Sequence, residues 1–396
     1  MQKELVLDSF LRLKQYVEKE EYKGWDPYDG LNSKVYQQIP FSNWKYPRWF
    51  WIQLFKRNPF NLRDLLRVPK DYNTKGIGLF LHGYCQLYKL SLNGIHEFGN
   101  PEELKEKIDF LGNLLIELRS PGYSGFCWGY NFDWQNRVFF QPKGTPTVVA
   151  TSFVANALHE AYLVTKEEKY LNGILSSCKF ICEDLNRTEY GNGKFIFSYS
   201  PLDKSQVYNA SLLGARLLAQ GYVYTKNEEW LDLSQRAVKT IMKLQDNKGG
   251  WVYGAANNQQ WIDSFHTGFN LECISDYMNY TGDKSFEKEL QKGTNYYLHN
   301  FFLTDGTPKY YHNHIYPIDI HSPAQFIITL IKLNKLEENI DLAEKVLNYT
   351  IHNMQDKEGY FYYQLKKGIS SKIPYMRWAQ AWMFYTFANF ILIKTK

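Results

Sequence analysis

The sequence has few cysteines and no long apolar run. Its five cysteines are odd in number and form no CxxC pair, and Cys178 and Cys182 lie four residues apart on an expected helix. This spacing favours packing over zinc or disulfide bonds. No stretch approaches the ~20 apolar residues of a membrane span, and the N-terminus lacks the apolar core and cleavage site of a signal peptide. These absences predict a cytoplasmic protein without a membrane span.

The chain also has only a small excess of charge of one sign. The 396 residues include 46 Lys and Arg against 41 Asp and Glu, which gives a net charge of +5. This excess is too small for a nucleic-acid partner, although it suits an anionic ligand. With 22% charged and 44% hydrophobic residues, the composition also excludes disordered, collagen-like and coiled-coil chains.

Aromatic residues, in contrast, are abundant. The chain has 31 Tyr, 26 Phe and 11 Trp, which together make 17% of its residues. Tyr and Trp combine an apolar ring with a polar group, so they suit a wet cavity or a sugar-binding site.

A weak internal repeat of about 55 residues organises the chain. Each unit has an apolar helix, a short polar turn such as TKEEKY or TKNEEW, a more amphipathic helix, and an aromatic connector with a glycine turn. Four units are clear, and the pattern extends one unit backwards and one helix forwards. The apolar helices begin near Lys75, Thr145, Val207, Phe265, His321 and Arg377.

These units predict an all-α fold, a closed (α/α)6 toroid of helical hairpins with short β-hairpins between repeats. An open solenoid needs polar caps, but the last helix, 376–393, is among the most apolar in the chain. A helix at 4–18 is expected to complete the outer ring. We expect residues 1–74 to pack on a toroid of residues 75–396 as one structural unit. A TIM barrel or doubly wound sheet is excluded, because β-branched runs before each helix are missing.

The glycines of KGIGLFLHG, residues 75–83, lack the preceding strand and the lysine–serine ending of a phosphate-binding loop. We therefore expect them to allow close packing of an inner helix, and we expect His82 to be a core residue.

The long connectors lead into the inner helices and should converge over one end of the ring, where binding groups usually lie on a rigid scaffold. Aromatic rings with amides and charged groups are the expected lining of a carbohydrate site. The residues predicted to bind substrate are Tyr28, Asp29, Trp128, Tyr130, Trp134, Arg137, Tyr199, Asn209, Tyr253, Trp261, Tyr316, Arg377, Trp378 and Gln380.

This six-hairpin frame resembles the α/α-toroid carbohydrate-active enzymes, which include glycoside hydrolases, uronate lyases and sugar epimerases. The segment VVATSFVANALHEAYLVTKEEKYL is similar to the catalytic helical domain of D-glucuronyl C5-epimerases. The resemblance implies an enzyme that acts on a glycan. Terpenoid and lanthionine cyclases share the toroid, but this chain lacks their carboxylate cluster and zinc ligands, respectively.

Two Asp/His pairs are the sharpest candidates for catalysis. Asp263 and His266 are three residues apart in WIDSFHTGF, and Asp319 precedes His321 one period later. Two such pairs entering one cavity would supply a general acid and a general base. The alternative is that each Asp caps a helix and each His is packed and hydrogen-bonded. No HxxxH or clustered carboxylate spacing supports a metal, and no cofactor is predicted.

Two further residues are catalytic candidates. Asp133 in NFDWQ is either a catalytic carboxylate or the start of an Asx turn. Tyr208 is either a base or part of the loop packing.

Two mechanisms fit the candidates. In the first, a uronic acid residue loses its C5 proton to a Tyr or His base, and Arg377, Arg137, Asn209 or Gln380 stabilises the enolate, which leads to epimerisation or elimination. In the second, two of Asp29, Asp133, Asp263 and Asp319 catalyse inverting hydrolysis. The excess of His and Tyr at the helix starts favours the first.

The predicted partner is therefore a poly- or oligosaccharide containing uronic acid. Two alternatives are a toroid that binds glycans without catalysis and a helical scaffold for protein partners.

Overall fold

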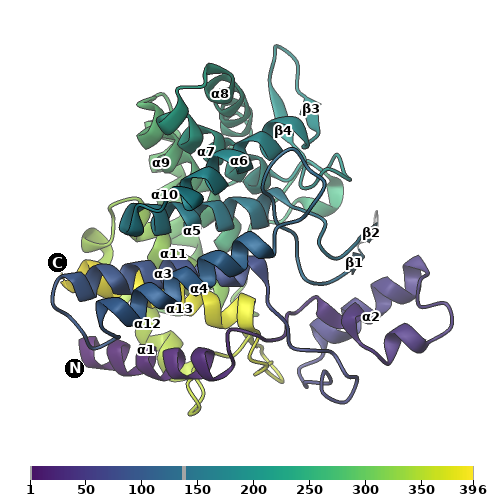
Figure 1. Ribbon diagram of the computed structural model, residues 1–396, viewed down its shortest axis with the longest axis vertical. Helices are drawn as coiled ribbons and strands as arrows, with labels where there is room; N and C mark the ends of the chain where they lie inside the picture. Colours follow the sequence, from purple (N-terminus) through teal and green to yellow (C-terminus); the bar gives the residue numbers. More distant parts are fainter. Residues whose placement is uncertain (1, 136–139, 396) are drawn as a thin grey trace.

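A computed structural model of the protein describes residues 2–135 and 140–395. Six helices form an inner ring in which each packs against the next. They are α3 (Thr74–Leu92), α5 (Val148–Thr165), α7 (Tyr208–Thr225), α9 (Ser264–Thr281), α11 (His321–Lys332) and α13 (Ala381–Thr395), the last preceded by a π-helical turn, η5 (Met376–Gln380). The last helix packs on the first, so α3 and α13 lie side by side (Figure 1). The predicted closed toroid is confirmed.

An outer helix packs against each inner helix. Five of them follow their partners in sequence: α4 (Pro101–Glu117), α6 (Glu168–Glu183), α8 (Glu228–Met242), α10 (Glu287–Phe301) and α12 (Ile340–Met354). The sixth, α1 (Gln2–Lys19), comes from the N-terminus and packs on α13 and α12. The first helix of the chain therefore completes the last hairpin, as the sequence predicts.

Burial explains the two kinds of helix. In α7 every residue from Tyr208 to Gly221 is buried, because neighbours surround an inner helix on all sides. The outer helix α8 instead buries one side, which includes Trp230, Leu233, Ala237 and Ile241. None of the described helices is long and apolar enough to cross a bilayer.

The short turns within three of the hairpins, after α5, α7 and α9, share one construction. The hydroxyls of Thr165, Thr225 and Thr281 each donate to the carbonyl four residues earlier, and each accepts the backbone N–H two residues later. Between these bonds the chain turns through a left-handed residue, which is Lys166, Lys226 or Gly282. This turn closes one end of the ring and leaves the other end to the long connectors.

The connectors carry three small antiparallel sheets. Strand β1 (Trp134–Gln135) pairs with β2 (Phe140–Gln141), and β3 (Arg187–Glu189) pairs with β4 (Phe195–Phe197). The third sheet joins two different connectors, since β5 (Ile318–Asp319) pairs with β6 (Gln364–Leu365).

The N-terminal segment after α1 packs at the same end as the connectors. It contains short 3-10 helices at Asp29–Asn32 and Tyr36–Gln38 and the helix α2 (Lys45–Arg57), which lies beside β1 (Figure 1). Two shorter 3-10 turns, Asn257–Gln259 and Glu337–Asn339, lie elsewhere in the chain. Phe10, Val17 and Trp25 belong to the same hydrophobic core as the inner helices.

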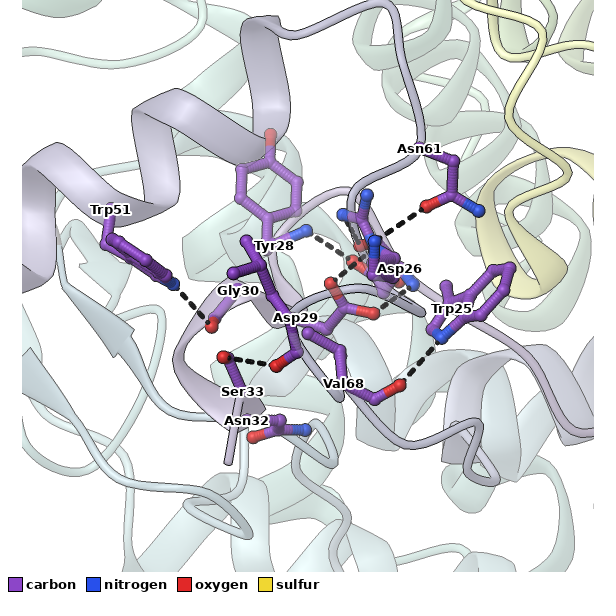
Figure 2. Close-up of polar contacts among 12 residues, drawn as sticks. Trp25, Asp26, Tyr28, Asp29, Gly30, Asn32, Ser33, Trp51, Asn61 and Val68 are labelled. Atoms are coloured by element: carbon purple, nitrogen blue, oxygen red, sulfur yellow. Dashed lines mark hydrogen bonds and ion pairs between the residues drawn. The ribbon is translucent and has the colours of Figure 1, made fainter. Parts of the chain in front are cut away.

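Buried polar contacts join two parts of this segment, the loop at residues 25–29 and residues 63–68 (Figure 2). Asp29 accepts the backbone N–H of Asp26 and pairs with the Arg63 guanidinium at 2.8 Å. Trp25 donates its indole N–H to the carbonyl of Val68 (Figure 2). Burial raises the pKa of Asp29 to about 6 although Arg63 opposes the shift.

The glycines of α3 lie at close contacts with the neighbouring inner helices. A Cβ built on Gly83 would lie 2.6 Å from the Phe384 ring, and Cβ atoms on Gly76 and Gly78 would contact the Cα atoms of Arg377 and Val154 at 3.4 Å. The packing role predicted for these glycines is confirmed. His82 is buried against Tyr385, in agreement with its predicted place in the core.

Candidate functional site

A cavity of about 900 Å³ opens where the connectors meet the inner helices. Its volume suits a ligand of one or a few sugar units. The sequence-predicted residues that line it come from six separate parts of the chain: Tyr28, Tyr130, Trp134, Tyr199, Asn209, Tyr253, Trp261, His266, His321, Arg377 and Trp378. The toroid therefore brings together most of the site residues that were predicted because they lie at or just before the start of an inner helix.

Asp263 holds His266 in one orientation. Asp263 caps α9, and its Oδ1 accepts the backbone N–H of His266 at 2.9 Å. Its Oδ2 lies 2.7 Å from His266 Nδ1 and accepts the indole N–H of Trp261 at 3.0 Å. A proton on Nδ1 leaves Nε2 as a lone-pair acceptor, which is the tautomer that a general base needs. Asp263 does not line the cavity itself.

The ring of Tyr253 completes the wall beside His266. It stacks on Trp261 with centroids 4.7 Å apart and an angle of 13° between the planes. Its centroid lies 4.6 Å from that of His266. A flat aromatic surface beside a histidine can hold the C–H face of a sugar ring.

His321 occupies a different environment from His266. Its ring stacks on Phe265 at 4.4 Å and contacts Trp382 at 4.2 Å, and both ring nitrogens lack a hydrogen-bond partner. Burial, together with the charge of Lys75, lowers the pKa of His321 well below its ordinary value. His321 is therefore neutral near pH 7.

Asp319 supports the backbone of His321 and not its ring. Its Oδ1 accepts the backbone N–H of His321 and the indole N–H of Trp378, each at 2.9 Å, and its Oδ2 accepts from the Gln364 amide at 2.6 Å. Burial raises the pKa of Asp319 to about 6. The two Asp/His pairs look alike in sequence, but only Asp263 contacts the imidazole of its partner.

Six other predicted residues, all in the described part of the chain, lie off the cavity surface. Trp128 and Gln380 are core residues: the Trp128 indole donates to the carbonyl of Leu115, and the Gln380 amide bonds both backbone groups of Phe361. The expectation that these two line the cavity is wrong. Their side chains instead bond backbone groups of the core and so hold the connectors in place. Asp29 is occupied by Arg63, as described above.

The remaining placements have local causes. Asp133 accepts the backbone N–H of Lys143 at 2.7 Å, a contact between residues ten apart in sequence and therefore not the expected Asx turn. Tyr208 lies off the cavity at the start of α7, and Tyr316 is 44% exposed beside a cis proline peptide. None of the three lines the cavity, which disagrees with the catalytic roles predicted for Asp133 and Tyr208 and with the substrate contact predicted for Tyr316. Arg137 lies outside the described residues.

Arg377 enters the cavity as half of a buried ion pair. Its Nε and Nη2 bond the two carboxylate oxygens of Asp26 at 2.5 and 2.8 Å. Its guanidinium also lies 5.0 Å from the centroid of Tyr130. Such a bidentate pair fixes the side chain while one nitrogen remains for a ligand.

Several lining residues escaped the sequence analysis. Trp49, Gln53 and Lys56 share one face of α2, and their spacing is the signal that would have found them. Lys75 lies in the first turn of α3, where a cation at the buried start of the helix is the missed signal. Asp203 lines the cavity but accepts hydrogen bonds from the backbone and hydroxyls of Ser200 and Ser205, so it holds a turn.

Within the described residues, no group of three or more His, Cys, Asp or Glu side chains is placed to hold a metal ion.

No family model matches the sequence, and no curated protein matches it. Solved structures do match the fold. A cellobiose 2-epimerase from Bacillus thermoamylovorans has a TM-score of 0.63 at 14% identity, over 83% of this chain and 90% of that one. A GH76 α-mannanase from Bacteroides thetaiotaomicron has a TM-score of 0.59 at 13% identity, over 82% and 88%.

An unsaturated glucuronyl hydrolase specific for heparin is also similar, with a TM-score of 0.57 at 14% identity, over 81% of this chain and 87% of that one. The long coverage of both chains shows that the whole ring is shared and not a single hairpin. The protein therefore has the α/α-toroid fold found in these sugar-acting enzymes.

Proposed function

We propose that the protein is an enzyme that removes the C5 proton of a uronic acid residue in a poly- or oligosaccharide. His266 and His321 act as the base and acid. The single observation that carries the proposal is their convergence on one cavity, one oriented by Asp263 and the other neutral and without a partner. The carbohydrate-acting enzymes among the fold neighbours support a glycan as the substrate.

The two histidines flank a common ring. The centroid of Phe265 lies 4.2 Å from that of His266 and 4.4 Å from that of His321. A sugar bound against this ring can therefore meet one imidazole on each side. This arrangement suits a reaction in which a proton leaves one face and returns to the other.

The chemistry follows from the carboxylate next to C5. An imidazole Nε2 takes the C5 proton, and the electrons of the C–H bond move into the carboxyl group to form an enolate. Return of a proton to the opposite face gives the C5 epimer. If the electrons instead expel the substituent on C4, the product is an unsaturated uronate. Arg377 and Asn209 both line the cavity, and the positive charge of Arg377 and the Nδ2 amide group of Asn209 would stabilise the enolate.

Hydrolysis with two carboxylates has less support. Of the four Asp residues considered for it, Asp29 is paired with Arg63 and Asp133 accepts a backbone N–H. Asp263 accepts from the Trp261 indole and Asp319 from the Gln364 amide, and neither carboxylate lines the cavity. Among the described lining residues Asp203 is the one carboxylate, and it is occupied by its own turn. An inverting hydrolase needs an acid and a base that both reach the glycosidic bond.

The test is incubation in D₂O with a panel of glycans, namely heparosan, alginate, pectate and neutral cellodextrins. We expect deuterium at C5 of one uronate polymer, with or without the ultraviolet absorbance of an unsaturated product. New reducing ends without deuterium would show hydrolysis and contradict the proposal. Deuterium at C2 of a cellodextrin would contradict the uronate substrate while keeping the histidine chemistry.

A further inference from the structure

Lys75 is a buried amine that faces the cavity without a partner. It is 3% exposed, lines the cavity, and makes no hydrogen bond or ion pair within the described part of the chain. The other buried cations near it are matched, since Arg377 pairs with Asp26 and Arg63 with Asp29. An unpaired buried amine is costly unless a ligand supplies the missing partner.

Three aromatic rings surround the Lys75 amine on the protein side. Its Nζ lies 3.9 Å from the centroid of Phe153, 5.1 Å from that of Phe269 and 5.2 Å from that of Trp382. Their π faces favour a cation but offer no hydrogen-bond acceptor in the plane of an N–H. The three donors of an ammonium group therefore depend on a ligand in the cavity.

The charged groups around Lys75 do not stabilise its protonated form. Burial, and then the positive charge of Arg377, lowers the pKa of Lys75 well below its ordinary value, and Asp26 opposes the shift only in part. His321, on α11, also faces Lys75, and His266 lies beyond Phe265. The described groups thus offer one carboxylate, and Arg377 already occupies it.

We propose that Lys75 is the binding site for the substrate carboxylate, and this rests on the uronate substrate of the proposed function. Lys75 and His321 share two neighbours, because the His321 ring lies 4.2 Å from Trp382 and 5.8 Å from Phe269. A carboxylate bound to Lys75 consequently brings the adjacent C5 to His321. The same bond selects uronates against neutral sugars.

Carboxylate binding is coupled to proton uptake. In the empty cavity burial disfavours the ammonium form, whereas a bound carboxylate stabilises it. The protein therefore takes up protons from solvent as the substrate binds. A neutral sugar provides no such charge and takes up none.

The test is calorimetric binding of 4-nitrophenyl β-D-glucuronide and 4-nitrophenyl β-D-glucoside, which differ in the group attached to C5. We expect the native protein to bind the glucuronide about 10-fold to 100-fold more tightly, the range of one charge-assisted hydrogen bond. Its binding enthalpy should vary with the ionisation enthalpy of the buffer. Lys75→Met should lose both the preference and the buffer dependence while still binding the glucoside.

Lys204 provides the matched control, because it lines the same cavity but is exposed. Lys204→Met should keep the preference for the glucuronide. Lys75→Gln is the second variant if Lys75→Met does not fold. A native protein that binds both probes equally or neither, or a Lys75 variant that keeps the preference, overturns the assignment.

The result is separable from the proposed function. Glucuronide preference without C5 exchange on any polymer would contradict the chemistry and leave the Lys75 site intact. Exchange on a uronate polymer with an unchanged preference in Lys75→Met would contradict the Lys75 site alone.

Discussion

At the scale of single residues, Asp263 shows why a sequence motif can be structural and functional together. Its two oxygens accept the N–H that begins α9, the His266 ring and the Trp261 indole. The same carboxylate thus makes both the helix cap and the contact with the imidazole that the proposed mechanism uses. The charge is needed only for the dyad, since an uncharged oxygen also caps a helix.

The variant Asp263→Asn separates these roles. An amide oxygen still caps α9, whereas the negative charge beside His266 Nδ1 is lost. We expect turnover to fall by about 100-fold with little change in melting temperature. Steady-state kinetics and thermal unfolding check this against Asp305→Asn, a turn carboxylate far from the cavity lining. Unchanged turnover would remove Asp263 from the mechanism.

Glu272 gives a prediction about pH and stability. It is buried inside the ring, where it accepts from Thr329 at 2.8 Å and from the Gln325 amide. Burial raises its pKa from 4.5 to about 7. Between these values the folded protein holds a proton that the unfolded chain has released, so stability falls as pH rises, by about 1 kcal/mol per pH unit at most.

The variant Glu272→Gln should remove this loss. Its stability relative to the native protein should increase as pH rises from 4.5 to about 7 and then stay constant. Urea unfolding at a series of pH values measures the difference. Parallel stability curves for the two proteins would show that Glu272 is ionised in the fold throughout.

Residue roles were only partly predictable from the sequence. Tyr253 and Trp128 both lie in aromatic connectors, but the first lines the cavity and the second fills the core. Whether an aromatic residue lines the cavity or the core depends on which side of the connector it occupies. That side is determined by contacts with residues distant in sequence. Lys75 was missed because a cation next to apolar residues has no periodic pattern of its own.

At the scale of elements, hairpins were easier to predict than connectors. The turns at Thr165, Thr225 and Thr281 depend on bonds within a few residues, so the repeat reveals them directly. The β5–β6 pairing joins Asp319 to Gln364 from different connectors. No local pattern encodes such a pairing, because its partners meet only after the ring has formed.

Gly83 tests the tight contact between α3 and α13. In Gly83→Ala the new Cβ would overlap the Phe384 ring, and we expect a loss of about 1 to 3 kcal/mol in unfolding free energy. Gly368→Ala is the matched control, since a Cβ there meets no atom within 4 Å. Denaturant unfolding of both variants gives the comparison. Equal stabilities would show that the helices separate without cost.

At the scale of the whole molecule, closure of the ring follows from the apolar character of α3 and α13, the first and last helices of the inner ring. The repeat predicts six hairpins, and α1 provides the outer helix that the last hairpin lacks. This was predictable because an apolar C-terminal helix cannot end an open array in water. The path of residues 20–73 was not, because that segment has no repeat and is fixed by buried ion pairs such as Arg63–Asp29.

Phe10 measures how much α1 contributes to the closed ring. It is fully buried and packs against Phe384, Phe387 and Phe98, with centroids 5.1 to 6.1 Å away. We expect Phe10→Ala to lower the unfolding free energy by about 3 to 5 kcal/mol. Phe110→Ala, on the outer helix α4 and 47% exposed, should cost much less. Similar losses in the two variants would contradict the closing role of α1.

The most direct test of the whole account is C5 deuterium incorporation from D₂O into a uronate glycan, followed by NMR in the native protein, His266→Gln and His321→Gln. His352→Gln, on the outer helix α12 and exposed, is the control. The account predicts one deuterium at C5 with the native protein and the control, and a rate at least about 100-fold lower in each cavity variant. Glycan conversion without C5 deuterium, or an unchanged exchange rate in both cavity variants, would contradict it.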